Sequence, residues 1–367
     1  MTDTSPMKVL LVGDFPPPHG GVAVHVEVLF RAIRAAGGTC EVLDIGKGQL
    51  PADGVVPAGH VARFTTLLGS YAARGFRIHV HTSGANPRSW MLAGICAAAG
   101  AVSGKAPLIT FHSGLCPAWI AESPVRQHAA RAVASRFGHV IAVSDGIRDC
   151  MLACGVAADR VEVMPAFSSS FLEPGAPPQG FAAVRAGAQP LFVAMLAPGK
   201  VYGHEILLNA FERVRAQVPT ARLALYGLGS ESVKAEGVTG FGELHRPAAL
   251  AVIAGGDVFV RPTLADGDSV SVREALALGR LVVATRVGNR PPEVRLVAAG
   301  DAQALALGLL EAAAEIVARP VRGAPAAPAA DSTHRLLTLY GHRAEASPAP
   351  TRASAAPEAR CAASAAS

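Results

Sequence analysis

The sequence predicts an α/β protein made of two doubly wound, Rossmann-like domains with a cleft between them. Three observations predict this fold class. Short β-branched runs alternate with helical segments in the first half of the chain, the same alternation returns in the second half, and a Pro/Gly/Ser-rich stretch separates the halves. With 367 residues, the chain is long enough for two such domains, each with its own core.

The first half is expected to form one parallel sheet, because each apolar run is followed by a segment of helical periodicity. The expected strands are Lys8–Gly13, Cys40–Leu43, Arg77–His81, Leu108–His112, His139–Val143 and Val161–Pro165, and two of the expected helices are Val22–Ala36 and Pro124–Phe137.

The second half repeats the pattern. Its expected elements are the strands Leu191–Leu196, Ala221–Tyr226 and Asp257–Val260, the apolar run Leu281–Ala284, and the helices Glu205–Ala216 and Pro247–Ala254. The expected domains are 1–172 and 190–330, joined by a linker at 173–189. A terminal helix is expected within 331–343, at Thr333–Tyr340, and a disordered Ala/Pro-rich tail at 344–367.

The composition excludes several classes of protein. Half of the residues are hydrophobic and 17% are charged, as in a globular protein. The net charge of +5 is modest, and no basic run indicates a nucleic acid partner. The scattered cysteines suit buried positions better than a metal site. The N-terminus lacks a signal-peptide layout, and the longest apolar stretch, Trp90–Ser103, is too short to span a bilayer, so a cytoplasmic protein is expected.

The most informative stretch runs from Arg261 to Gly279. A strand leads into a Gly-containing loop and then into a helix, and the Ser271-to-Glu274 spacing predicts a capping box with a helix start near Ser271. A helix N-terminus offers free amides to an anion, whereas the carboxylates of Asp266 and Glu274 accept hydrogen bonds from hydroxyls. Together they suit a sugar attached to a nucleoside diphosphate.

This stretch resembles the acid-x7-acid signature of retaining glycosyltransferases of the GT-B fold, most closely glycosyltransferase family 4. Pro262–Thr263, Asp266–Gly267 and Glu274–Ala275 fall at the family's spacings. The first acid is Asp rather than the usual Glu, and Asp268–Ser269 replaces an aromatic-Gly pair. The resemblance implies two facing domains, a metal-independent transfer of a hexose-type sugar with retention, and a terminal helix that crosses back to the first domain.

The resemblance also implies roles for single residues. Asp266 would hold sugar hydroxyls, Glu274 the ribose, and His112 the reacting face of the sugar. Lys200 would neutralise the leaving diphosphate, but Met195 stands where the family has an arginine, so Arg261 is our candidate for the missing cation. The other expected donor and acceptor contacts are Gly20, Gly21, Gly227, Gly229, Gly267, Asp268, Ser269, Val270 and Ser271.

Each assignment has a plainer alternative. Glu274 could serve only as the third residue of a capping box, Lys200 could be a solvated surface lysine, and His112 and His81 could be structural strand-end histidines. Asp266-Gly267-Asp268 also spells the Asp-x-Asp metal motif of GT-A enzymes, but such a motif belongs in a single-sheet domain. The Gly20–Gly21 turn is neither a G-x-G-x-x-G fingerprint nor a Walker motif, which disfavours NAD and ATP.

We therefore expect a retaining hexosyltransferase of polysaccharide, glycolipid or other glycoconjugate biosynthesis, with no cofactor and no metal. Its expected partners are a nucleoside-diphosphate sugar and a hydroxyl acceptor, with lipid-linked glycans among the alternatives. Peripheral membrane contact stays open, and nucleic acid is not expected. The rival functions are a nucleotide-sugar epimerase or phosphorylase of the same architecture, and a non-catalytic scaffold subunit of a polysaccharide assembly complex.

Overall fold

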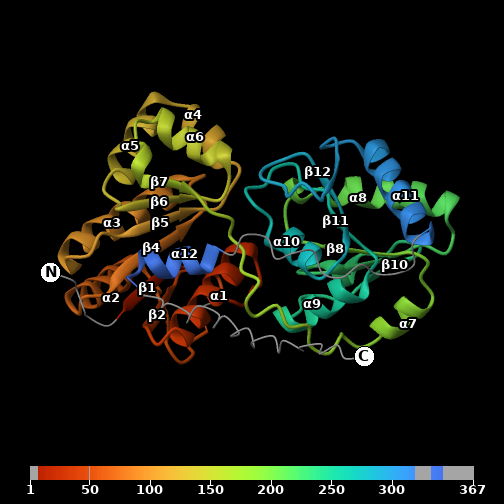
Figure 1. Cartoon of the computed structure of the whole chain (residues 1–367), viewed down its shortest axis with the longest axis horizontal. Coiled ribbons are helices and arrows are strands. Elements are labelled where there is room, and N and C mark those ends of the chain that lie inside the picture. Colours follow the sequence, from red (N-terminus) through yellow and green to blue (C-terminus); the bar gives the residue numbers. More distant parts are fainter. Residues whose placement is uncertain (1–6, 49, 319–331, 342–367) are drawn as a thin grey trace, which may run out of the picture.

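The computed structural model describes residues 7–48, 50–318 and 332–341, which form two α/β domains side by side (Figure 1). Each domain is built on one sheet whose paired strands are all parallel, with helices on both faces. The predicted fold class is confirmed. The predicted tail at 344–367 lies outside the described residues.

The first sheet has seven strands in the order β3-β2-β1-β4-β5-β6-β7. Their bounds are β1 Lys8–Gly13, β2 Thr39–Asp44, β3 Val55–Pro57, β4 Arg77–Thr82, β5 Leu108–Phe111, β6 His139–Ala142 and β7 Val161–Val163. The helices are α1 Gly21–Ala35, α2 Val61–Ala73, α3 Pro87–Ser103, α4 Cys116–Ala121, α5 Pro124–Ala134 and α6 Asp145–Ala153. The sequence does not predict β3, a three-residue edge strand that ends in proline.

The second sheet has six strands in the order β10-β9-β8-β11-β12-β13. Their bounds are β8 Leu191–Met195, β9 Arg222–Tyr226, β10 Val238–Gly240, β11 Val258–Arg261, β12 Leu281–Thr285 and β13 Arg295–Val297. The helices are α7 Phe181–Ala186, α8 His204–Gln217, α9 Arg246–Gly255, α10 Val270–Ala277 and α11 Ala302–Ala318. The edge strands β10 and β13 are too short to show periodicity in the sequence.

The strand order reverses once in each sheet, between β1 and β4 and between β8 and β11. In doubly wound sheets, ligands bind in the crevice that opens at the carboxyl ends of the strands at such a reversal. The loops that follow β1, β4, β5, β8 and β11 are therefore the segments that can build a site.

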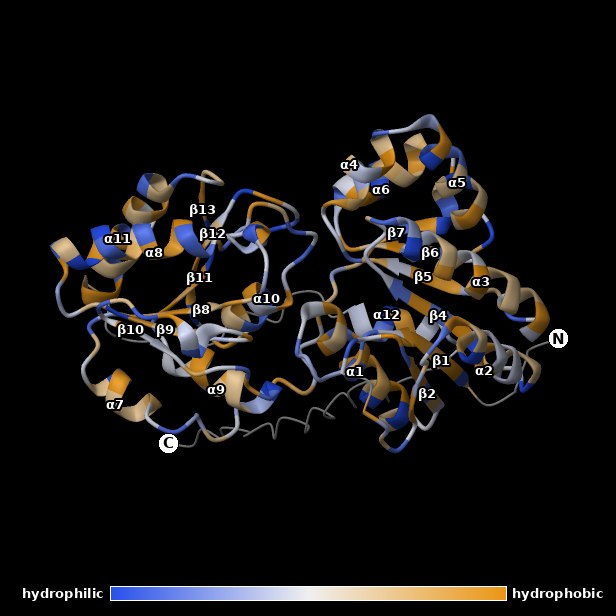
Figure 2. Cartoon of the chain, turned by 180° about the vertical axis from the view of Figure 1, so that it is seen from behind, coloured by the Kyte–Doolittle hydropathy of each residue, from blue (hydrophilic) through white to orange (hydrophobic). Residues whose placement is uncertain are grey.

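Each domain has its own hydrophobic core, and Val270 of the second domain also packs on the core of the first. Figure 2 shows mainly hydrophobic strands covered by helices with mixed hydrophobic and hydrophilic faces. Phe76, Phe111 and Phe137 are among the largest side chains buried in the first domain, and Phe192 and Phe211 among those in the second. None of the described helices is long and apolar enough to cross a membrane.

Two helices outside the runs of alternating strands and helices each pack on one of the two domains. Helix α7 lies inside the predicted linker 173–189, and it packs on the second domain through Phe181 and an ion pair of Arg185 with Asp257 at 2.9 Å. Helix α12, Ser332–Leu339, returns to the first domain (Figure 1). There Ser332 donates to the carbonyl of Pro165 at 2.7 Å, and Leu336 joins the apolar cluster beneath the first sheet.

Candidate active site at the domain cleft

Lys200 lies in a turn directly after β8, beside the loop that follows β11. The turn is a 3₁₀ helix, Lys200–Tyr202, held by a hydrogen bond from the Leu264 amide to the Val201 carbonyl at 2.7 Å. The guanidinium of Arg261 lies 5.6 Å from the centre of the Tyr202 ring. Lys200 is exposed and forms no ion pair with any residue that the structure describes. A cation is thus available at the strand end where the sequence predicts one.

Asp266 is the centre of an arginine network. Its Oδ2 accepts from Arg261 Nε at 3.2 Å, from Arg290 Nη2 at 3.0 Å and from Thr263 Oγ1 at 3.3 Å, and its Oδ1 accepts from the Gly267 amide at 3.1 Å. Burial alone would raise the pKa of Asp266, but the two guanidinium groups outweigh it and hold the pKa below its ordinary value. Asp266 is therefore ionised at neutral pH.

Helix α10 begins at Val270, one residue before Ser271, so the predicted helix start near Ser271 is confirmed, but its N-cap is Ser269 and the predicted capping box is wrong. Glu274 falls too far along the helix to reach the N-cap amide. Its Oε1 instead accepts from Arg246 Nε at 3.1 Å and Nη2 at 3.0 Å, and both side chains are buried. Burial raises the pKa of Glu274, although Arg246 opposes the rise.

Asp268 is fully buried and does not face a metal site. Both of its oxygens accept from Arg273 Nε at 2.8 Å, and Oδ2 accepts from the Ala166 amide of the first domain at 3.2 Å. Burial raises the pKa of Asp268 to about 6, with Arg273 opposing. Because arginines bind the carboxylates of both Asp266 and Asp268, the structure disfavours the alternative of an Asp-x-Asp metal motif.

Gly227 and Gly229 follow β9 and line the same end of the second sheet. Both have left-handed backbone, with φ of +103° and +87°. A β-carbon on Gly227 would lie 2.1 Å from the Leu196 carbonyl oxygen, at the end of β8. The positive φ and this close approach both require glycine at Gly227, where the turn after β9 packs against the end of β8.

The two domains touch through closely packed loops. A β-carbon on Gly114 would lie 1.9 Å from the Asp266 carbonyl oxygen, and one on Gly267 would lie 2.2 Å from the His112 carbonyl oxygen. Gly20 is the N-cap of α1, whose first residue, Gly21, faces Val270 across the cleft. These contacts bring Gly20, Gly21 and His112 of the first domain to the α10 end of the second domain.

Two cavities adjoin these loops. One, of about 290 Å³, lies between the domains and is lined by Gly114, Ser144 and Asp145 on one side and Asp266 and Asn289 on the other. The second, of about 600 Å³, lies wholly in the first domain. It is lined by apolar residues such as Val22, Phe64 and Ile95 and by the polar residues Asp14, His81, Thr82, Asn86 and Arg88.

The structure thus brings most predicted residues to the region where the two domains meet, and of these residues Asp266 lines the cavity between the domains. Lys200, Arg261, Asp266, Glu274 and the amides from Gly267 to Ser271 lie on the second-domain side, and His112 approaches from the first. Sequence reasoning missed three arginines: Arg246, Arg273 and Arg290. Only Arg273 lies near its partner in the sequence, five residues after Asp268, whereas Arg246 and Arg290 lie 28 and 24 residues from theirs.

Solved structures with the same architecture define the fold as GT-B. Anabaena HepE in complex with UDP-glucose has a TM-score of 0.62 at 17% identity, over 90% of this chain and 95% of that one. Sucrose-phosphate synthase from Thermosynechococcus elongatus has a TM-score of 0.60 at 18% identity, over 91% and 95%. A protein designated as a candidate UDP-N-acetylglucosamine 2-epimerase from Listeria monocytogenes has a TM-score of 0.62 at 13% identity, over 91% and 95%.

Within this fold, residues 188–315 match the family described as "Glycosyl transferases group 1". The matched segment spans β8 to α11 and contains the Lys200 turn, the Asp266 network and helix α10. A comparison with curated protein sequences finds no match.

Proposed function

We propose that this protein is a retaining glycosyltransferase that moves a hexose-type sugar from a nucleoside diphosphate to a hydroxyl acceptor, in the synthesis of a polysaccharide, glycolipid or other glycoconjugate. One observation carries the proposal. The segment that matches group 1 glycosyltransferases places Lys200, Arg261 and the N-terminus of α10 around one crevice, at the carboxyl ends of β8 and β11. A UDP-hexose is the first donor to test, because the similar Anabaena HepE is solved with UDP-glucose.

The charge of this crevice suits a diphosphate. Arg246 and Glu274 neutralise each other, as do Arg273 and Asp268, whereas Arg261 and Arg290 share the single carboxylate of Asp266. Lys200 adds a second uncompensated positive charge. In this proposal these cations and the first amides of α10 stabilise the negative charge that develops on the leaving diphosphate, so the transfer step requires no metal.

The sugar would occupy the cavity between the domains. Asp266 Oδ1 accepts one backbone hydrogen bond, which leaves it able to accept another from a sugar hydroxyl. His112 would approach the reacting face from the first domain. Both arginine bonds to Glu274 use Oε1, which leaves Oε2 for a ribose hydroxyl. The ion pair and the predicted ribose contact are therefore compatible.

The acceptor would bind in the cavity of the first domain, which combines apolar walls with one cation, Arg88, that can bind an anionic group and one carboxylate, Asp14, that can accept from hydroxyls. Val61 and Met91 at its edge are 58% and 54% exposed. An acceptor with an anionic group and an apolar chain, such as a lipid-linked glycan, fits this combination. The exposed edge would then be the place of peripheral membrane contact.

The proposal is tested first by donor binding. The full-length protein is mixed with UDP-, GDP- and ADP-hexoses, with and without EDTA, and its thermal unfolding is recorded. We expect one nucleotide class to raise Tm by the same amount in both conditions. A mixture with a hydroxyl acceptor is then followed by NMR at early times, and we expect the product to keep the anomeric configuration of the donor.

Other outcomes would replace the proposal. Conversion of the donor without an acceptor would indicate an epimerase, and dependence on inorganic phosphate a phosphorylase. No shift with any nucleotide sugar would indicate a non-catalytic scaffold subunit. Inversion at the anomeric carbon would overturn the retaining mechanism alone.

A further inference from the structure

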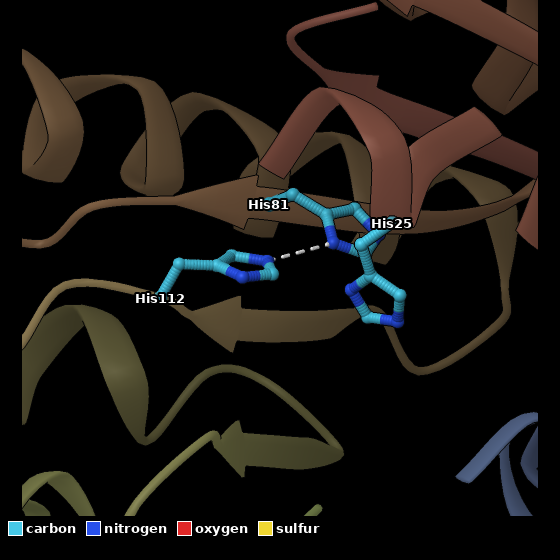
Figure 3. A group of neighbouring side chains, drawn as sticks. All are labelled: His25, His81 and His112. Carbon is cyan, nitrogen blue, oxygen red and sulfur yellow. Dashed lines mark hydrogen bonds between the residues drawn. The ribbon is translucent and has the colours of Figure 1, made fainter. Parts of the chain in front are cut away.

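Three histidines from three elements of the first domain meet (Figure 3), and one of them, His81, lines the 600 Å³ cavity. His25 lies on α1, His81 near the end of β4, and His112 directly after β5. These elements become neighbours because β4 lies between β1 and β5 in the sheet. One nitrogen of each ring lies within 4.8 Å of a nitrogen of the other two. We call these residues the histidine cluster.

Hydrogen bonding accounts for one contact in the histidine cluster, between His81 Nδ1 and His112 Nε2 at 3.1 Å, but not for the rest of it (Figure 3). Both ring nitrogens of His25 and Nε2 of His81 are buried without a partner among the described residues. His79, two residues earlier on β4, shows the contrast, because Tyr340 and Thr110 bind its two nitrogens. Buried polar groups without partners are rare in native proteins and cost about 1–3 kcal/mol each. A cluster with several of them indicates a missing ligand rather than a structural core.

The rings are in the form that binds cations of the transition series. Burial lowers the pKa of His25 to about 4, and burial together with the neighbouring imidazoles holds the pKa of His81 and His112 well below the ordinary value. Neutral imidazole has a free lone pair on one nitrogen, whereas imidazolium has none. The histidine cluster therefore presents ligands that are ready to coordinate at neutral pH.

We propose that the histidine cluster binds one divalent transition-metal ion of the Zn²⁺ class. Three imidazoles with one open position are an established donor set for Zn²⁺, with metal–nitrogen bonds of about 2.0–2.1 Å. Such bonds put two nitrogens of a tetrahedral site roughly 3.4 Å apart, and His81 Nδ1 lies 3.1 Å from His112 Nε2. A nitrogen of His25 lies within 4.8 Å of this pair, so His25 must close on it by at most about 1.4 Å to reach the same spacing. Coordination through His81 Nδ1 leaves His81 Nε2 able to bind an occupant of the 600 Å³ cavity, which His81 lines.

The test uses the full-length protein, stripped with EDTA and titrated with Co²⁺, whose visible absorption distinguishes tetrahedral from octahedral coordination. We expect one equivalent to bind with a tetrahedral spectrum and to be displaced by Zn²⁺. His112→Ala, His81→Gln and His25→Gln should each weaken binding at least about 100-fold, while circular dichroism checks that each variant is folded. His128→Ala, which changes an exposed histidine outside the cluster, is the matched control and should bind like the parent.

Absence of stoichiometric binding would overturn the proposal. So would binding that survives all three variants, or a sulfur-to-cobalt charge-transfer band, which would place the ion on cysteines instead. The titration needs no donor sugar, so its result is independent of the proposed transferase activity. The donor-induced rise in Tm should in turn be insensitive to EDTA, because the contacts proposed for the diphosphate, Lys200, Arg261 and the first amides of α10, include none of the three histidines.

Discussion

The two faces of the cleft satisfy their polar groups in opposite ways. On the second domain, Asp266, Asp268 and Glu274 are all paired with buried arginines. On the first domain, the histidine cluster is neutral and keeps several nitrogens without partners among the described residues. A buried charge without a partner is far more costly than a buried neutral group. The carboxylates of the second-domain side, the charged face, therefore need arginine partners within the folded chain. The first-domain side, the neutral face, can stay folded without a bound ligand.

The largest expected effect comes from breaking a buried pair on the charged face. Arg246→Met would leave the Glu274 carboxylate buried without its cation, and removal of one partner of such a pair costs about 3–5 kcal/mol. We expect a loss of this size in the free energy of unfolding, measured by urea denaturation. The double variant Arg246→Met/Glu274→Gln should be more stable than Arg246→Met alone. A mild effect of Arg246→Met would show that the fold does not depend on the pair.

The second prediction concerns catalysis by the uncompensated cations. Lys200→Met and Arg261→Met should each lower kcat about 100-fold or more, because each removes positive charge from the developing diphosphate. Equal losses would support our assignment of Arg261 to the role that Met195 cannot fill. Lys234→Met, at an exposed lysine of the same domain, is the control and should keep full turnover. Unchanged kcat in both cleft variants would contradict the charge-based account of this face.

Local sequence patterns predict the central part of the fold and some of the site residues. The alternation of apolar runs and helical segments predicts the central strands of both sheets closely, but not β3, β10 and β13, which have three residues each. Lys200, Asp266 and His112 are recognisable because polar residues at the ends of parallel strands mark the ligand side of a doubly wound sheet. Their roles stay predictions.

The partners of these residues depend on tertiary structure. Arg246 meets Glu274 from 28 positions away, on a different helix, and no local pattern marks that pairing. The histidine cluster depends on the strand order as well, since His25, His81 and His112 become neighbours only where β1, β4 and β5 are adjacent. Motif spacing identifies residues within one strand–loop–helix unit, whereas charge compensation between units requires the folded chain.

The third prediction concerns the contribution of Asp268 to the pH dependence of the free energy of unfolding. The pKa of Asp268 is raised to about 6 in the folded protein, against about 3.9 in an unfolded chain. The folded state therefore binds the proton more tightly, and the resulting stability is present below about pH 4 and lost as the pH rises through 6. The free energy of unfolding should fall over this window by roughly 2 kcal/mol more in the parent than in Asp268→Asn. Parallel urea-denaturation profiles would contradict the raised pKa.

The smallest expected effect tests how the two faces meet. Gly114→Ala would put a methyl group 1.9 Å from the Asp266 carbonyl oxygen, so the loops would have to separate. Because this contact joins domains with separate cores, we expect little change in Tm and about a tenfold loss in kcat/KM, or about 1.4 kcal/mol. Gly69→Ala is the matched control: a β-carbon on Gly69 has no neighbour within 4 Å, and the change should raise stability by about 0.5–1 kcal/mol without affecting turnover. An unchanged kcat/KM in Gly114→Ala would show that turnover does not depend on close contact between the two domains. It would also contradict the proposal that the sugar reacts in the cavity between them.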